Sequence, residues 1–362
     1  MLDLKAHLKT MVEAHAPSGH EEDLRHVLHE EWQNLTDDMQ QDGLGSLIGV
    51  KYATVPTESP RKIMLAAHMD EIGMLVRDIV EGFIYVQDIS GMDNRVMMAQ
   101  PVMVHGKKQL PGIVATTPPH LLSPEMRKKY PPFDSLVIDV GLPADEVKEL
   151  VNIGDIVTLD VPMLELQNKR VAGKAMDDRA CIAAITVCLD ALQFVQHSWD
   201  VYATATAQEE TGLYGAATAA HKINPDIAIA LDVGFAEQPG VKVGGAVKMG
   251  GGPLVGIGPN FHDKLREKLM ETAEYHEIKV NPDPAPAGSG TDAWAIQVAC
   301  EGIPTLLISI PIRNMHSPVE TLDLADIERA GRLLAHFITR LDEDFMTAID
   351  WDDYQELESD ET

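Results

Sequence analysis

Four short apolar runs in this chain each lead to residues that can bind a metal ion. IMLAA leads to His68, VYATATA to Glu209 and Glu210, IAIAL to Asp232, and TLLISI, through a short proline-containing loop, to His316. Brief runs of this kind, partly β-branched, are typical of strands that are buried on both faces of a sheet. In open α/β sheets, ligands bind beyond the carboxyl ends of the strands. The pattern therefore predicts an α/β fold in which these side chains gather in one crevice.

A further acidic residue, Asp177, lies at the start of a predicted helix. The segment that follows it carries apolar residues at helical spacing, namely Ile182, Ile185, Leu189, Leu192 and Val195. This spacing places Asp177 near the N-terminus of the helix. An acidic residue at such a place can also be simply a helix N-cap without a metal, and we interpret its neighbour Asp178 in that way.

Together these residues supply the ligands of a two-metal site. The imidazoles of His68 and His316 and the carboxylates of Asp177, Glu210 and Asp232 suit zinc, cobalt or manganese, and a carboxylate can bridge two ions. A lone histidine or aspartate at a strand end is more often structural. Five such residues at strand ends or at a helix entry favour metal binding instead. We predict two divalent ions per subunit, zinc or cobalt before manganese.

Charge and composition narrow the classes of partner. The chain has 57 acidic and 29 basic residues among 362, which gives a formal net charge of −28. This balance argues against nucleic acid and anionic membrane surfaces as partners. Three cysteines are too few for a disulfide framework, and the N-terminal segment lacks the apolar core of a signal peptide. We therefore expect a cytoplasmic protein.

The chain divides into a split catalytic domain and an inserted module. Between 71 and 165, glycine and proline are frequent, and short runs such as FIYVQDI and SLVIDVG alternate with turns. The predicted parts are a discontinuous catalytic domain over 1–70 and 166–346, a β-rich insertion over 71–165 and an acidic tail over 347–362. In the N-terminal part, Ser18-Gly19-His20-Glu21 fits a capping box that opens a helix.

Glu209 can supply the general base that a two-metal hydrolase needs. In a two-metal hydrolase, a metal ion polarises the scissile carbonyl and acidifies a water molecule. Glu209 can accept the proton of that water and return it to the leaving amine. Two alternatives stay open: a glycoside hydrolase that uses Glu209 and Glu210 as its acid pair, and a non-catalytic metal-binding oligomeric shell. Neighbours on one strand seldom flank a bond at the ~5–9 Å that glycosidases use. A non-catalytic shell would need a broken base or ligand, and neither is broken in this sequence.

Six sequence blocks, in order, resemble those of one peptidase family. AAHMDEIG, VAGKAMDDRA, TAQEETGLYGA, LDVG, GSGTDAWAI and IRNMHSPVET are similar to blocks of the co-catalytic metallo-aminopeptidases of family 42, which include glutamyl, deblocking and tetrahedral archaeal aminopeptidases. The resemblance implies a mixed-sheet α/β/α exopeptidase domain for two metal ions, with an inserted β-barrel-like dimerisation domain. It also implies that the enzyme removes N-terminal residues from short peptides, and that dimers of it assemble into dodecamers.

The resemblance further implies roles for individual residues. Asp177 would bridge both ions, His68 and Asp232 would bind one ion, and Glu210 and His316 would bind the other. Glu209 would be the general base. Asp70 would be an outer partner that fixes the His68 imidazole.

Thr291, Asp292 and Arg313 are the candidate substrate contacts. Arg313 can pair with an acidic substrate side chain or with a structural carboxylate, and Asn314 follows it where the family pattern has an aromatic residue. Few basic residues accompany the ligand motifs, so we expect a neutral or broad preference for the N-terminal residue rather than an acidic one. The acidic balance of the chain favours a cationic α-amine.

Overall fold

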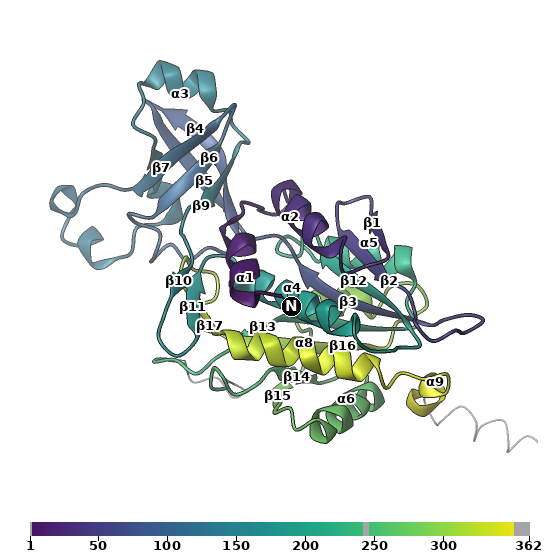
Figure 1. Cartoon of the computed structure of the whole chain (residues 1–362). Coiled ribbons are helices and arrows are strands. Elements are labelled where there is room, and N and C mark those ends of the chain that lie inside the picture. The colour runs from purple at the N-terminus through teal and green to yellow at the C-terminus, as the bar shows by residue number, and fades with distance from the viewer. Residues whose placement is uncertain (1, 242–245, 351–362) are drawn as a thin grey trace, which may run out of the picture.

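The computed structural model describes residues 2–241 and 246–350, and an eight-stranded mixed sheet lies at its centre (Figure 1). Its strands lie in the order β1 (Asp38–Gln41), β2 (Leu47–Lys51), β12 (Asp200–Thr206), β3 (Lys62–His68), β13 (Ile227–Phe235), β16 (Thr305–Ile312), β14 (Leu254–Ile257) and β15 (Asn281–Pro284). The four strands from β12 to β16 are mutually parallel, almost entirely buried, and correspond to the four apolar runs. The predicted α/β fold with a mixed sheet is confirmed.

The helices pack on this sheet in two groups. One contains α4 (Met176–Leu192), which lies on β3, β13 and β16, together with α1 (Leu4–Glu13) and α8 (Leu324–Ile338). The other contains α5 (Tyr214–Ile223) and α7 (Asp292–Ile296), which contact each other and the same sheet. The remaining helices of this domain are α2 (Glu22–Trp32), α6 (Asp263–Tyr275) and α9 (Phe345–Ile349). The main apolar core lies between these helices and the sheet.

A closed six-stranded antiparallel barrel forms a second body beside the sheet (Figure 1). Around the barrel the strands are β4 (Gly73–Val80), β5 (Phe83–Ile89), β8 (Val137–Asp139), β7 (Gln109–Ala115), β6 (Pro101–His105) and β9 (Ile156–Leu159). Its connections include α3 (Ala144–Leu150) and three short 3-10 helices, η1 (Pro119–Leu121), η2 (Met126–Lys128) and η3 (Phe133–Ser135). Inward-facing residues such as Val86, Val104 and Ile138 give the barrel its own core. The β-rich, barrel-like insertion is confirmed, whereas its boundaries at 71 and 165 and its role in dimerisation stay predictions.

A small sheet connects the start of α4 with the segment after β16. It consists of β10 (Leu164–Glu165), β11 (Arg170–Gly173) and β17 (Glu320–Asp323), all antiparallel. Gly173 pairs with Glu320 in this sheet. The pairing brings Glu320 close to the first residues of α4.

The predicted capping box at the start of α2 is not formed. The helix begins at Glu22 without a side-chain cap. Ser18 donates its hydroxyl to Asp70, and the carboxylate of Glu21 accepts the backbone N–H groups of Gly19 and Gln208. Contacts with distant segments have therefore replaced the local cap.

The C-terminal tail is described only in part. Helix α9 runs over Phe345–Ile349, and its Ile349 is buried. The rest of the predicted acidic tail, over 351–362, lies outside the described residues. Over 2–241 and 246–350, no helix combines the length and the apolar character that a membrane crossing requires.

Candidate metal centre and active site

The carboxyl ends of the parallel strands form one edge at which the predicted ligands gather. The residues are His68 at the end of β3, Asp232 in β13, Glu209 and Glu210 after β12, His316 after β16 and Asp177 at the start of α4. All six line one cavity of about 610 Å³. This volume is within the range of ~300–1,000 Å³ that is usual for small-molecule sites.

Asp177 lies between the two histidines. Its Oδ1 is 3.1 Å from His68 Nε2, and its Oδ2 is 3.5 Å from His316 Nε2. Glu210 Oε1 is 3.6 Å from the same nitrogen of His316, and Glu209 Oε2 is 3.9 Å from His68 Nε2. A carboxylate that presents one oxygen to each imidazole has the arrangement needed to bridge two ions.

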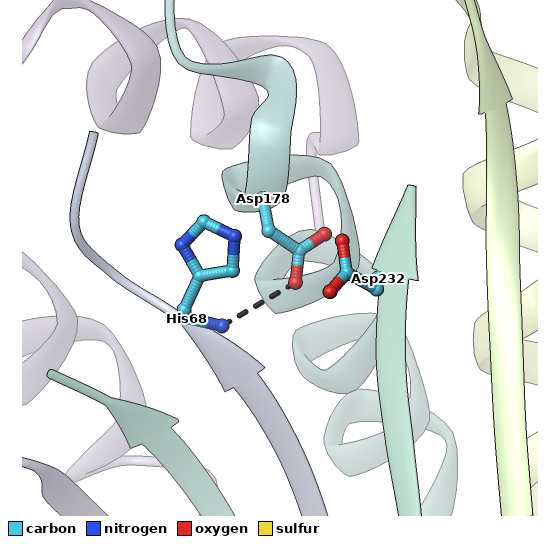
Figure 2. A group of neighbouring side chains, drawn as sticks. All are labelled: His68, Asp178 and Asp232. Carbon is cyan, nitrogen blue, oxygen red and sulfur yellow. Dashed lines mark hydrogen bonds between the residues drawn. The ribbon is translucent and has the colours of Figure 1, made fainter. Parts of the chain in front are cut away.

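Asp178 belongs to the cluster, and our interpretation of it as an N-cap is wrong. Figure 2 shows the carboxylate of Asp178 next to that of Asp232, with the imidazole of His68 on its other side. Ligand atoms of His68, Asp178 and Asp232 all lie within 4.8 Å of one another, and the same holds for a group of His68, Asp177 and Glu210. Asp178 Oδ2 accepts the His68 backbone N–H at 3.3 Å. Its buried Oδ1 makes no hydrogen bond within the described part of the chain.

Several carboxyl groups in the cavity have raised pKa values. Burial, reinforced by Asp232, raises the pKa of Glu209 to about 10 although His68 opposes the change. Burial and then the charge of Asp177 raise the pKa of Glu210 to about 7, and that of Asp232 well above its usual range. The raised pKa values mean that too little positive charge surrounds these carboxyl groups to keep them ionised. Divalent cations would supply that charge and displace protons, so the donor set fits the predicted metal ions.

Glu320, which the sequence analysis missed, orients two of the predicted ligands. The side chain is buried, and its oxygens accept the backbone N–H groups of His316 at 2.7 Å and Asp177 at 3.0 Å. Burial and the nearby Asp177 carboxylate raise the pKa of Glu320 to about 8. The interaction with Asp177 also raises the pKa of His316 to about 9. The available signal was an acidic residue only four positions after His316.

Asp70 contacts the site through its backbone and its side chain. Its carbonyl oxygen lies 3.0 Å from His68 Nδ1, whereas its carboxylate Oδ1 lies 3.6 Å from that nitrogen. The carboxylate instead accepts the backbone N–H groups of Glu209 at 3.0 Å and Glu210 at 3.1 Å. The carbonyl of Asp70 therefore makes the closer contact with the imidazole, while its side chain holds the segment that carries Glu209 and Glu210.

Comparison with known proteins identifies the family of this chain. Residues 45–333 match the family model for M42 glutamyl aminopeptidases. The chain belongs to this M42 family. A lysyl aminopeptidase from Pyrococcus furiosus is 34% identical, over 92% of this chain and 96% of its own length.

Solved structures of M42-like aminopeptidases have the same overall fold. A TET aminopeptidase from a marine sediment Thaumarchaeota archaeon superposes with a TM-score of 0.90 at 33% identity, over 96% of this chain and 99% of that one. The TET1 peptidase of Pyrococcus horikoshii, described as able to assemble into a tetrahedron or a large octahedral shell, gives a TM-score of 0.82 at 32% identity, over 94% and 100% of the two chains. Membership of this peptidase family favours peptide hydrolysis over the glycoside hydrolase alternative.

The three candidate substrate contacts of this M42 peptidase lie in different places. Thr291 lines the cavity. Asp292 is buried, accepts a hydrogen bond from the Thr206 hydroxyl and is not among the described residues that line the cavity. Arg313 Nε donates to the carbonyl oxygen of Glu237 at 2.7 Å, and Arg313 also lies outside that lining.

The cavity lining also includes apolar residues. They are Leu213, Val233, Phe235, Trp294 and Met315. Gly288 leaves room for the indole of Trp294, because a Cβ at position 288 would lie 2.5 Å from the ring. The lining of the cavity in this M42 family member thus contains both acidic and apolar side chains.

Proposed function

We propose that this chain is a binuclear metal-dependent aminopeptidase that removes N-terminal residues from short peptides in the cytoplasm. The observation that carries the proposal is the position of Asp177, whose two oxygens face His68 and His316. Asp232 accompanies the first imidazole and Glu210 the second. This mixture of imidazoles and carboxylates suits two divalent ions per subunit, zinc or cobalt in the first place and manganese as the alternative.

Glu209 is the proposed general base. When bound, the ions would polarise the scissile carbonyl and acidify a water molecule. Glu209 lies in the same cavity and accepts the proton of the water, which it returns to the leaving amine. The hydrogen bond from its backbone N–H to Asp70 keeps Glu209 at the edge of the site. Glu209 and its neighbour Glu210 therefore have different tasks, one in proton transfer and the other in holding a metal ion.

The proposed substrate is a peptide with a free N-terminus and a neutral first side chain. Leu213, Phe235 and Trp294 offer apolar contacts to that side chain, and Thr291 offers a hydroxyl. Arg313 already donates to a backbone carbonyl, and no lysine or arginine is among the described residues that line the cavity, so none is available there to pair with an acidic substrate side chain. The excess of carboxylates attracts the cationic α-amine.

The other proposed partners are further copies of this chain. Dimers formed through the barrel would build a dodecamer, and the assemblies described for the TET1 peptidase support this proposal. The barrel also exposes apolar side chains, among them Val80, Phe83 and Ile113. Nucleic acid and membranes are not proposed as partners because the net charge is −28.

Light scattering tests the proposed assembly. Replacement of residues 73–159 by a short linker should leave only smaller species. An unchanged large assembly would locate the essential contacts outside the barrel, and a monomeric wild type would refute the dodecamer.

Two substitutions at adjacent positions test the proposed chemistry. Glu209→Gln should keep both metal ions while kcat falls by roughly 100-fold or more. Glu210→Ala should lose occupancy of one metal site. Elemental analysis that found Glu209→Gln depleted of metal and Glu210→Ala fully loaded would reverse the two roles.

N-acetylation tests whether the enzyme needs a free α-amine. A leucyl peptide should be cleaved from its N-terminus, and its acetylated form should not be cleaved. Efficient cleavage of the acetylated peptide would refute the aminopeptidase proposal.

A further inference from the structure

The four residues from Ala207 to Glu210, here called the Glu209 loop, lie beyond the end of the sheet ladder. Strand β12 ends at Thr206, and Gln208 has a positive φ of 57°. This left-handed conformation is unfavourable for a residue other than glycine, so the surrounding contacts must hold it. The position of Glu209 consequently depends on those contacts.

The carbonyl oxygens of the Glu209 loop are held by the turn that follows and by the barrel. The donors are Gly215 N to Ala207 O at 2.9 Å, Tyr214 N to Gln208 O at 3.4 Å, Gly212 N and Leu213 N to Glu209 O at 2.9 Å each, and the Ser90 hydroxyl to Glu210 O. All but the last of these contacts are local in sequence. They form a turn but do not fix its direction relative to the metal ligands on other strands.

The backbone N–H groups of the loop, in contrast, all donate to side chains of distant segments. The pairs are Ala207 N to Ser46 Oγ at 3.3 Å, Gln208 N to Glu21 Oε1 at 3.1 Å, Glu209 N to Asp70 Oδ1 at 3.0 Å and Glu210 N to Asp70 Oδ2 at 3.1 Å. Every backbone N–H and carbonyl group of the loop thus has a partner. The side-chain acceptors are the contacts that set the loop against the rest of the site.

Glu21 differs from Asp70 because it stands apart from the reacting groups. It is 2% exposed, and its Oε1 accepts both Gly19 N at 2.7 Å and Gln208 N at 3.1 Å. Within the described ranges it makes no hydrogen bond or ion pair with a predicted metal ligand or with the side chain of Glu209. One buried oxygen therefore ties the N-terminal segment to the residue in the left-handed conformation.

We propose that Glu21 is a positioning residue, which holds the Glu209 loop so that the carboxylate of Glu209 reaches the reacting water. The proposal rests on the proposed function of Glu209 as general base. Without an acceptor at position 21, the backbone N–H groups of Gly19 and Gln208 lose their partner, and Gln208 loses the contact that opposes its relaxation. Because catalysis is sensitive to misplacements of about 1 Å, the loss should appear in kcat.

Variants of Glu21 separate hydrogen bonding from charge. Glu21→Met removes the acceptor and should lower kcat by roughly 10- to 100-fold with KM and metal content near those of the wild type. Glu21→Gln keeps an oxygen at the same reach and should retain at least about a third of kcat. If Glu21→Met does not fold, Glu21→Asp replaces it, since its shorter side chain cannot reach both N–H groups.

Asp326 provides a matched control. It is also a buried carboxylate that accepts two backbone N–H groups, those of Gly250 at 2.6 Å and Gly252 at 2.8 Å, and this turn does not line the cavity within the described residues. Asp326→Leu should lower stability but leave kcat within about threefold. An equal loss of kcat in this control would show a general effect of destabilisation and overturn the proposal.

Three further results would also overturn the role of Glu21. They are a wild-type kcat in Glu21→Met, a kcat of Glu21→Met that recovers once metal is added back, and a Glu21→Gln variant as inactive as Glu21→Met. Glu209→Gln is measured in parallel. If it kept full activity, the proposed function itself would fail, whereas an inactive Glu209→Gln beside a fully active Glu21→Met would remove only the role of Glu21.

Discussion

His7 should make the stability of this protein depend on pH in a way that one variant can isolate. The residue lies in α1, and its Nε2 is 3.0 Å from the hydroxyl of Thr186 in α4. Trp32 Nε1 donates to the same hydroxyl at 2.9 Å. Burial lowers the pKa of His7 from 6.5 to about 4. His7 therefore stays neutral in the folded chain at pH values at which the unfolded chain protonates it.

The sign and size of the effect follow from these two pKa values. As the pH falls, the unfolded state binds the proton first, so the stabilisation is complete above pH 6.5 and is lost between pH 6.5 and about 4. One pKa unit corresponds to about 1.4 kcal/mol, which gives a loss of about 3 kcal/mol. This is an upper limit, because Glu31 lies 4.0 Å from His7 Nδ1 and partly compensates a charge there.

Urea unfolding of the wild type and of His7→Gln, at pH 7.5 and 4.5 and at one protein concentration, measures the effect. The glutamine cannot titrate, and the comparison cancels the titration of all other groups. At pH 7.5 the variant should be less stable by about 1 kcal/mol because packing is lost. Between the two pH values, the difference should shift by about 2–3 kcal/mol in favour of the variant. A difference that stays constant would refute the buried, neutral state of His7.

Three further predictions concern Lys174, Trp294 and Glu320. Burial lowers the pKa of Lys174 from 10.5 to about 8 although Glu71 opposes the change, so the free energy of unfolding should rise by up to about 3 kcal/mol between pH 8 and 10.5. In urea unfolding, Lys174→Met should abolish this rise. A rise that persists in the variant would contradict the prediction. Trp294→Ala should lower kcat/KM roughly 10-fold for a leucyl substrate but less than about threefold for an alanyl one. Equal losses would show that the indole does not contact the first side chain. Glu320→Leu should weaken metal binding by roughly 10- to 100-fold in competition with a chelator, and unchanged affinity would contradict its role in orienting His316.

The fold and the place of the site could be predicted from local sequence because each strand carries its own signal. His68 and Asp232 belong to apolar runs that can be recognised without knowledge of their neighbours, and parallel strands end at the same edge. The barrel could be predicted as β-rich for the same reason. Its closure could not be predicted from local patterns and was expected only from the family resemblance, because it depends on pairings of β9 with β4 and β6, which lie far apart in sequence.

Residues that support the site were harder to predict, since their sequence patterns are ambiguous. Ser18 and Glu21 have the spacing of a capping box, and Asp178 has the position of an N-cap, but their oxygens bond to other segments. Glu320 accepts a hydrogen bond from Asp177, which is 143 residues away. A local pattern specifies that an acceptor is present, whereas the tertiary fold decides which donor reaches it.

The most direct test of a binuclear site is the stepwise return of metal to metal-free protein. Zinc or cobalt is titrated into the metal-free enzyme, while bound metal per subunit and cleavage of a leucyl chromogenic substrate are measured on the same samples. We predict that two equivalents bind per subunit and that full activity appears only as the second binds, since Asp177 faces both His68 and His316. Full activity with one equivalent, or without metal, would contradict the binuclear mechanism.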